Sequence, residues 1–258
     1  MTMYMVTHKM VNFIPKGRIP IFVGNGNNEK NFLRDNTGNN ISSKNKYYSE
    51  LTAMYWIWKN DQTSNYVSIE HYRRFFMNPT YFLPKIISDK KISKLISNDR
   101  IIVPQKQRWS VSIGDHYKTN HSTRDFNNTL KIIKRIYPGY VSSFNKVMNG
   151  HSLFAYNMLV MPKKMFDEYC SWLFTILFEL EEVTDLSKRN TYQQRAYGFM
   201  AERLFNVWLI HNIDCKDIVE LPVYYLTDNK VKTVLKSIKS RLDKRPYIPQ
   251  KTTEGLHQ

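Results

Sequence analysis

The sequence predicts an α/β protein with a largely parallel central sheet. Short apolar runs alternate with longer segments of helical periodicity, which is the pattern of strand–helix–strand units. Several apolar runs end directly in polar residues, as strands do at the carboxyl edge of a parallel sheet. With 258 residues, 42% of them hydrophobic, the chain can bury a substantial core. These values exclude disordered, collagenous and low-complexity proteins.

Strands are expected where short apolar runs are bounded by turn residues. The first run ends in the polar residues Thr7, His8 and Lys9. The second is followed by a turn rich in glycine and asparagine and by a polar loop over residues 31–40. The predicted strands lie at residues 4–7, 19–23, 66–69, 101–104 and 154–161.

Helices are expected where apolar residues recur every three to four positions. Leu51, Tyr55 and Trp58 have this spacing, and Asn60 with Asp61 ends their helix. The predicted helices cover residues 47–59, 126–137, 164–182, 192–212 and 230–242.

The last predicted helix is strongly basic. One of its faces is apolar, and its other faces carry lysine and arginine. Such a helix either lies in the interface of an anionic membrane or packs on the domain as an ordinary surface helix. We expect one domain over residues 1–227 and a basic amphipathic tail over 228–258. The apolar face consists of Val231, Val234, Leu235, Ile238 and Leu242.

The charge of the chain points to an anionic partner. Lys plus Arg number 38 and Asp plus Glu number 22, which gives a formal net charge of +16. Nucleic acid, a lipid headgroup and a phosphorylated substrate all fit that charge. The two cysteines, Cys170 and Cys215, read as packing residues and indicate a reducing compartment. No apolar stretch follows a basic start, and none approaches the length of a membrane span, so a cytoplasmic location is expected.

Two polar segments are candidates for a ligand site. Residues 7–9 and 70–74 follow the first and third predicted strands, and the ends of parallel neighbours share one crevice. Lys9, His71, Arg73 and Arg74 in that crevice would favour a diphosphate, because guanidinium forks bind phosphate oxygens in pairs. A solvated strand end is the alternative for the two arginines.

Several common catalytic patterns are absent from the sequence. There is no Walker A loop, GxGxxG, CxxC, HExxH or GxSxG, and no DxD pair follows an apolar run. Glu70 and His71 are the residues of this segment that could hold a divalent cation. Glu202 lies near a glycine at the start of a predicted helix, where it is either a general base or an acidic residue favoured by the helix dipole.

Specific segments resemble a bacterial family of unknown function from capsule, exopolysaccharide and O-antigen gene clusters. Its members are assigned as glycosyltransferases, some of them galactofuranosyltransferases. The resemblance covers about residues 4–212 and is carried by MVTHK, LRDNTGNNISSKN, YYSELTAMYWIWKN, YVSIEHYRRFF, VMNGHSLFAYNMLVM and YGFMAERLFNVWL.

The resemblance implies a GT-A-like single domain with a mostly parallel central sheet flanked by helices. The end of the first strand, Thr7 to Lys9, would then hold the nucleotide. Arg73 and Arg74 stand in the segment that is normally an acidic DxD, and we expect them to neutralise the departing diphosphate. The alternative is that Glu70 or His71 holds manganese or magnesium; the prediction includes no metal ligand.

The remaining site residues also follow from the resemblance. Glu202 would be the catalytic base of an inverting transfer. Further donor contacts are expected from the polar family-motif positions, for most of which a turn or capping role is an equal alternative. These positions are Asp35, Asn36, Asn45, Asn157 and Arg203.

The expected partners are a nucleotide-sugar donor, with UDP-galactofuranose as the first candidate, a lipid-linked oligosaccharide acceptor and the anionic inner face of the cell membrane. A non-catalytic protein that binds nucleic acid or another polyanion is the alternative. No nucleic-acid-binding signature is present, and the aromatic residues fall at core spacings, so no nucleic acid is expected.

Overall fold

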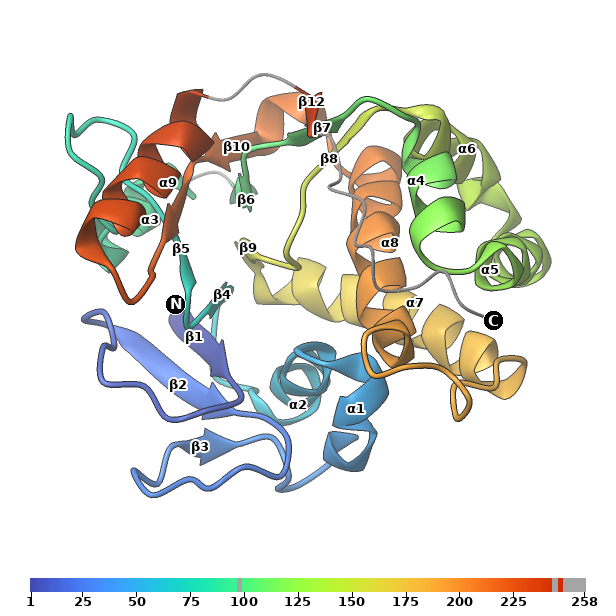
Figure 1. Ribbon diagram of the computed structural model, residues 1–258, viewed down its shortest axis with the longest axis horizontal. Coiled ribbons are helices and arrows are strands. Elements are labelled where there is room, and N and C mark those ends of the chain that lie inside the picture. Colours follow the sequence, from blue (N-terminus) through green and yellow to red (C-terminus); the bar gives the residue numbers. More distant parts are fainter. Residues whose placement is uncertain (97–98, 243–245, 248–258) are drawn as a thin grey trace.

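The computed structural model describes residues 1–96, 99–242 and 246–247 (Figure 1). Its main sheet has the order β10-β6-β9-β4-β1-β2-β3, with β5 pairing to β4 and β11 pairing to β5. The strands β1, β2, β3, β4, β6 and β10 run in one direction, and β9 runs against its neighbours β4 and β6. The predicted α/β class with a mostly parallel sheet is confirmed. The strands are β1 Thr2–Thr7, β2 Arg18–Phe22, β3 Leu33–Arg34, β4 Tyr66–His71, β5 Arg74–Phe76, β6 Ile101–Pro104, β9 Leu159–Pro162, β10 Ile218–Leu221 and β11 Val223–Tyr225.

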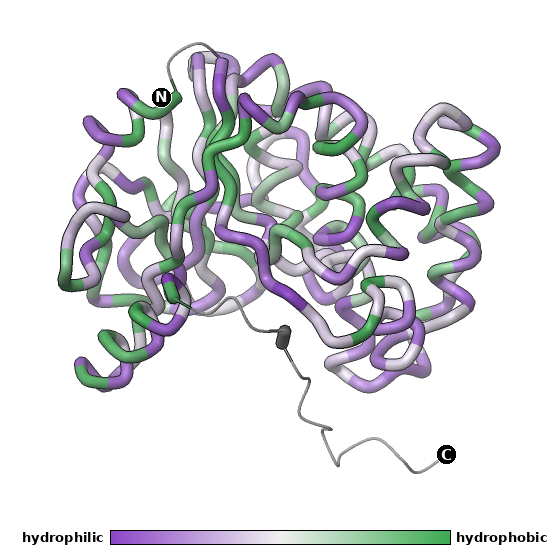
Figure 2. The backbone as a smooth tube through the Cα atoms, turned by 90° about the horizontal axis from the view of Figure 1, so that it is seen from above, coloured by the Kyte–Doolittle hydropathy of each residue, from purple (hydrophilic) through white to green (hydrophobic). Residues whose placement is uncertain are grey.

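Helices cover both faces of this sheet. The larger core forms where α2, α7 and α8 pack on the strands, and α4, α5 and α6 extend it to one side. A smaller core under α3 includes Met3, Ile92 and Val160. Figure 2 shows green, hydrophobic tube along the central strands and alternating colours along the outer helices. The helices are α1 Asn45–Tyr48, α2 Leu51–Asn60, α3 Asp89–Leu95, α4 Ile113–Asn120, α5 Thr123–Ile136, α6 Val141–Asn149, α7 Lys163–Glu182, α8 Ala196–Asn212 and α9 Lys230–Leu242.

Serine residues set the starts of three helices. The side chains of Ser88, Ser112 and Ser122 accept hydrogen bonds from backbone N–H groups three residues later, which satisfies donors that the first helical turn leaves unpaired. The predicted stop of α5 is also confirmed, because Pro138 begins a short 3-10 turn after Ile136.

Two predicted elements differ from the structure. The helix expected over 47–59 is interrupted at Ser49, whose φ of 52° lies in the left-handed region. The strand expected over 154–161 is restricted to β9, because Tyr156 and Asn157 have φ values of 78° and 50°. Two consecutive non-glycine residues in that region interrupt any extended strand. Both deviations lie at the edge of the sheet that carries the candidate site.

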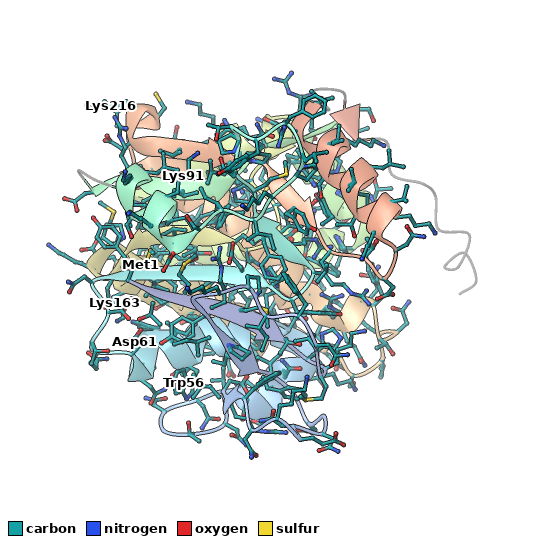
Figure 3. The ribbon with its side chains drawn as sticks, turned by 90° about the vertical axis from the view of Figure 1, so that its left-hand side faces the viewer. Met1, Trp56, Asp61, Lys91, Lys163 and Lys216 are labelled. Carbon is teal, nitrogen blue, oxygen red and sulfur yellow. The ribbon has the colours of Figure 1, made fainter. Side chains whose placement is uncertain are left out.

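The opposite end of the sheet, where the parallel strands begin, is closed by structural contacts. The Tyr4 hydroxyl donates to Asp61 at 2.9 Å, and the Lys163 N–H donates to the carbonyl of Asn65 at 2.8 Å. Figure 3 shows Met1, Asp61 and Lys163 along this edge, at the amino ends of β1 and β4. Ligand chemistry is therefore expected at the other edge, where the parallel strands end.

The last helix belongs to the folded body. Helix α9 packs on β11, and a short second sheet joins β7 Gln107–Trp109, β8 Ser152–Leu153 and β12 Pro246–Tyr247. Residues 243–245 and 248–258 of the predicted tail lie outside the described residues. Within the described part of the chain, no helix is both long and apolar enough to cross a bilayer.

Candidate active site

The polar ends of β1 and β4 come together as the sequence predicts. The two strands are parallel neighbours, with Val6 opposite His71. The ring of Tyr72 lies at the centre of this edge. His8 meets it edge-on with ring centroids 5.2 Å apart, while Lys9 and the Arg73 guanidinium lie 5.6 and 5.2 Å from its centroid. Cations and an aromatic ring are thus gathered where the strands end.

The first of these ends has a fixed shape. The Thr7 hydroxyl is buried and donates to the carbonyl of Lys9 at 2.5 Å, which holds the turn after β1. His8 projects from this turn. Burial, together with nearby Lys9, Arg195 and Arg73, lowers the pKa of His8. The imidazole is therefore neutral at pH 7 and can both donate and accept hydrogen bonds.

The Tyr156–Asn157 turn connects most of the polar groups at this edge. The Tyr156 N–H donates to Glu202 Oε1 at 3.0 Å, and its carbonyl accepts from His71 Nε2 at 2.6 Å. The Asn157 amide donates to Glu50 Oε1 at 2.8 Å. The left-handed backbone of both residues is what aims these groups at three different elements, and such strained backbone persists where the surroundings hold it in place.

Two carboxylates lie on either side of this turn. Glu202 on α8 is held by Tyr156 and by Arg203, whose Nη1 lies 3.2 Å from Oε2. Burial raises the pKa of Glu202, and the negative charge of Glu50 raises it further, while Arg203 and Arg74 oppose the shift. A carboxylate with a raised pKa is a stronger proton acceptor at neutral pH.

His71 is locked in one tautomer. A backbone carbonyl can only accept, so Nε2 carries the proton and donates it to Tyr156. Burial lowers the pKa of this imidazole, and Arg74 lowers it as well, against the opposing charge of Glu50. Neutral His71 therefore keeps Nδ1 as a hydrogen-bond acceptor.

Arg73 and Arg74 line one small pocket. The pocket has a volume of about 170 Å³ and is closed by residues 225–228 and by Lys236 of α9. Arg74 lies over the Tyr156 ring at 4.5 Å, and its Nε is buried without a hydrogen-bond partner among the described residues. Three cationic side chains around one cavity suit a phosphate group. A larger hollow of about 340 Å³ beside Trp109 and His151 is lined by neither Glu50 nor Glu202 and by neither Arg73 nor Arg74.

The chain can now be compared with known proteins. The family described as "Domain of unknown function (DUF4422)" matches residues 2–213. The chain belongs to the DUF4422 family. No protein of curated function matches it.

The solved apo structure of WbbM, a bifunctional glycosyltransferase, is similar to this DUF4422 chain. The TM-score is 0.79 and the sequences are 29% identical over 88% of this chain and 45% of WbbM. The chain therefore spans less than half the length of that enzyme. The match confirms the predicted GT-A-like arrangement of a mostly parallel sheet flanked by helices.

The metal alternative does not fit this member of the DUF4422 family. Glu70 is fully buried, its Oε2 accepts from Arg18 Nε at 2.8 Å, and its Oε1 accepts from the Phe76 N–H at 2.7 Å. His71 Nε2 is engaged by Tyr156. Within residues 1–96, 99–242 and 246–247, no group of three or more histidine, cysteine or carboxylate side chains could hold an ion. The alternative that Glu70 holds a metal is wrong, because that carboxylate is part of a buried ion pair.

Three other predicted donor contacts lie beside this centre. Asp35 is buried directly after β3, and burial raises its pKa. Asn36 follows it on the surface. The Asn45 amide donates to the carbonyl of Ser49 and to Thr52, and its Oδ1 faces Gly24. These contacts agree with the turn-stabilising alternative for Asn45, and the donor contacts of Asp35, Asn36 and Asn45 stay predictions.

The surroundings of Arg203 differ from those expected of a residue that contacts the nucleotide-sugar donor. Arg203 is buried, and its Nη2 lies 3.3 Å from His116 Nδ1, which accepts the hydrogen bond. Burial and Arg203 together lower the pKa of His116 to about 4. Arg203 thus contacts Glu202 from the buried side of that carboxylate. Its Nε has no hydrogen-bond partner in the described structure.

Glu202 lies near the first turns of its helix, as the sequence indicates. Helix α8 begins at Ala196, so Glu202 lies in its second turn. Its position is set by the Tyr156 N–H and not by the helix dipole. Tyr156 and Arg195 were not predicted as site residues, and Tyr72 was predicted only as part of the segment 70–74. The Arg195 Nε donates to Ser49 at 3.0 Å. The sequence signal for them was weak, since each is an ordinary aromatic or basic residue.

Proposed function

We propose that this DUF4422 chain is a glycosyltransferase that moves a sugar from a nucleotide diphosphate donor to an acceptor hydroxyl. The similarity to a glycosyltransferase at 29% identity supports this class of reaction. The observation that carries the proposal is the placement of a partly buried carboxylate, Glu202, and two guanidinium groups, Arg73 and Arg74, around one end of the sheet. Arg74 contacts the ring of the same residue, Tyr156, whose N–H holds Glu202.

The proposed step needs a base on one side and cations on the other. The acceptor oxygen attacks the anomeric carbon and gives its proton to Glu202, while the bond from that carbon to the phosphate oxygen breaks. Its electron pair goes to the diphosphate, where Arg73 and Arg74 stabilise the charge. Atoms and charge balance without a further reactant, and the step inverts the anomeric centre.

Glu50 assists by electrostatics in this proposal. Its charge raises the pKa of Glu202, and Asn157 keeps it in place. Glu50 also follows the left-handed Ser49, so the interruption between α1 and α2 is what brings it to the crevice. Asp115 is a poorer candidate for the base, because it is largely exposed and caps α4 with Ser112.

The nucleotide is proposed to lie along the neighbouring strand ends. Thr7, His8 and Lys9 follow β1, and buried Asp35 follows β3. Asp35 Oδ2 is buried without a hydrogen-bond partner among the described residues. This oxygen is suited to accept a hydrogen bond from the ribose or the base of the nucleotide.

The finer assignments rest on the family resemblance. We take UDP-galactofuranose as the first donor to test and a lipid-linked intermediate of capsule, exopolysaccharide or O-antigen synthesis as the acceptor. Such an acceptor would be reached from the cytoplasmic side, with the protein peripherally bound to an anionic membrane. The basic C-terminal region supports the membrane part of this proposal.

A thermal-shift experiment tests the function class. A nucleoside diphosphate at about 100 times its dissociation constant adds about 2.7 kcal/mol to the stability of the folded chain, and we expect a rise in Tm of about 5 °C or more. Oligonucleotides should produce no comparable rise. A rise only with oligonucleotides that vanishes steeply with added salt would contradict the proposal and favour a polyanion-binding protein.

A further inference from the structure

Helix α9 is attached to the protein by its polar face. Thr233 and Ser237 are buried, and their hydroxyls accept from the backbone N–H groups of Thr227 and Tyr225 at 3.0 and 2.9 Å. Ser240 Oγ accepts from the Val223 N–H at 3.2 Å and donates to the Val223 carbonyl at 3.1 Å. The open edge of β11 is thereby satisfied by hydroxyl groups.

Part of the apolar face of the same helix points away from the protein, while Val234 and Ile238 of that face are half-buried. Val231, Leu235 and Leu242 are 66%, 62% and 69% exposed. At 3.6 residues per turn, these three positions lie about 180° around the helix from Thr233, Ser237 and Ser240. An amphipathic surface helix normally does the reverse and buries its apolar stripe.

A neighbouring loop continues the exposed apolar surface. Tyr81, Phe82 and Leu83 are 49%, 93% and 64% exposed. Arg241 at the end of α9 donates from Nη1 to the Tyr81 carbonyl at 2.8 Å, which ties the loop to the helix. In Figure 1, α9 lies at the periphery of the molecule and far from α5. We call the residues Tyr81, Phe82, Leu83, Val231, Leu235 and Leu242 the docking face.

The charged side chains of α9 itself have one sign. Residues 230–242 contain five lysine or arginine residues and no aspartate or glutamate. On the loop side, Lys85 and Lys91 lie 5.1 and 6.0 Å from the centroid of the Tyr81 ring. Lysines beside an apolar stripe can bury their stems while their ammonium groups reach phosphate headgroups.

From these observations we infer that the docking face inserts into the interface of an anionic lipid bilayer. A helix of 13 residues, about 20 Å long, can lie in the membrane plane with its apolar stripe among the acyl chains. An aromatic and aliphatic loop beside it inserts at the same depth. A protein partner for so basic a rim would need a matching acidic surface, whereas an anionic bilayer supplies the complementary charge over the whole face.

This inference rests on the proposal that the acceptor is held in a membrane, and the fold connects the two. Lys236 of α9 lines the pocket of Arg73 and Arg74. A bilayer bound along α9 would therefore lie next to the proposed diphosphate site. The inference adds to the proposed function the surface that meets the lipid and the orientation of the crevice toward it.

Vesicle co-sedimentation of the full chain tests the docking face. We expect binding to vesicles of phosphatidylglycerol and phosphatidylethanolamine and little binding to pure phosphatidylcholine. The triple variant Val231→Ser, Leu235→Ser, Leu242→Ser should lose about 100-fold or more in affinity, and Phe82→Ser with Leu83→Ser about 10-fold. The double variant Lys232→Glu, Lys239→Glu should lose about 10-fold or more and make binding less sensitive to salt.

A matched control uses apolar residues of similar chemistry elsewhere on the surface. Val183 and Ile210 are 46% and 45% exposed, and Val183→Ser with Ile210→Ser should bind vesicles like the unchanged chain. Equal binding by the docking-face variants and this control would overturn the inference, as would no vesicle binding by the unchanged chain. A dimer in light scattering that the triple variant converts to monomer would overturn it in favour of a second copy.

The experiment also separates the two proposals. The docking-face variants should keep the thermal shift with nucleoside diphosphate, because their side chains point away from the domain. Vesicle binding without a rise in Tm with nucleoside diphosphate would contradict the proposed function and support the docking face. A rise in Tm without vesicle binding would contradict the docking face and support the proposed function.

Discussion

Strand β4 ends between two buried polar sites that differ in how their hydrogen bonds are satisfied. At Glu70, both carboxylate oxygens are engaged, by Arg18 and by the Phe76 N–H. Around Arg74 and Asn157, buried polar atoms have no hydrogen-bond partner in the described residues. Buried polar groups are normally satisfied, because leaving one unpaired is costly. The difference teaches that the first pair holds the sheet together, and we propose that the second group binds a ligand.

The largest expected effect comes from Glu202, which is held by the Tyr156 N–H and by Arg203. Glu202→Gln should lower the transfer rate about 10²- to 10⁴-fold, because the amide cannot accept the acceptor proton. The thermal shift with nucleoside diphosphate should stay, since Glu202 lies on the acceptor side of the proposed bond. Steady-state transfer and thermal shift on the same preparation check both parts. A rate within about threefold of the unchanged chain would require a different base.

Mutation of the ion pair between Glu70 and Arg18 should change the stability of the folded chain. Glu70→Gln leaves the Arg18 guanidinium buried without a countercharge, and we expect a loss of about 3–5 kcal/mol in the free energy of unfolding. Urea denaturation measures it. Glu168→Gln, an exposed carboxylate on α7, is the control and should change stability by less than about 0.5 kcal/mol. If Glu70→Gln unfolded like the control, the assignment of this pair to structure would be wrong.

The two arginines of the candidate site should act on the donor. Arg73→Met and Arg74→Met should each weaken nucleoside diphosphate binding about 10- to 100-fold, because each removes a charge-assisted hydrogen bond. Isothermal titration measures this, with Arg124→Met on the exposed side of α5 as control. Unchanged affinity in both variants would place the diphosphate elsewhere.

A smaller effect should appear in the pH profile. The transfer needs Glu202 ionised, so its raised pKa means that the rate falls on the acid side as pH drops through that value. Glu50→Gln removes a negative charge that contributes to the raised pKa, and the acid limb should move to lower pH. Gln keeps the oxygen that accepts from Asn157, so the turn should stay in place. A limb that moved to higher pH would contradict the proposed role of Glu50.

The smallest effect is expected from metal removal. Because Glu70 is engaged by Arg18, the transfer rate should change by less than about twofold in EDTA. A complete loss that manganese restored would show that the cationic pocket does not neutralise the diphosphate alone.

The sequence predicted more of the fold than of the candidate site. Strand and helix positions followed from local periodicity, and the meeting of Thr7–Lys9 with His71–Arg74 followed from the rules of parallel sheets. The ion pair of Glu70 did not, because Arg18 lies 52 residues away in the chain. The interruption at Ser49 and the turn at Tyr156 were also invisible, since non-glycine residues in left-handed backbone are imposed by tertiary contacts.

The face of α9 shows the same limit in another way. The apolar set from Val231 to Leu242 was recognisable in sequence, but its direction was not. Thr233, Ser237 and Ser240 read as unremarkable polar positions, although they are the ones that pack against β11. Amphipathicity predicts a helix and its two faces; what each face touches depends on the neighbouring strand.

The hydroxyl groups that α9 presents to β11 have a practical consequence for shortened proteins. Deleting everything after residue 227 would strip the amides of Val223 and Tyr225 of their acceptors and leave a bare strand at the rim of the sheet. Such rims recruit strands from other molecules, so the shortened chain should self-associate and precipitate. Poor recovery of that fragment would then report an uncapped strand and say nothing about lipid.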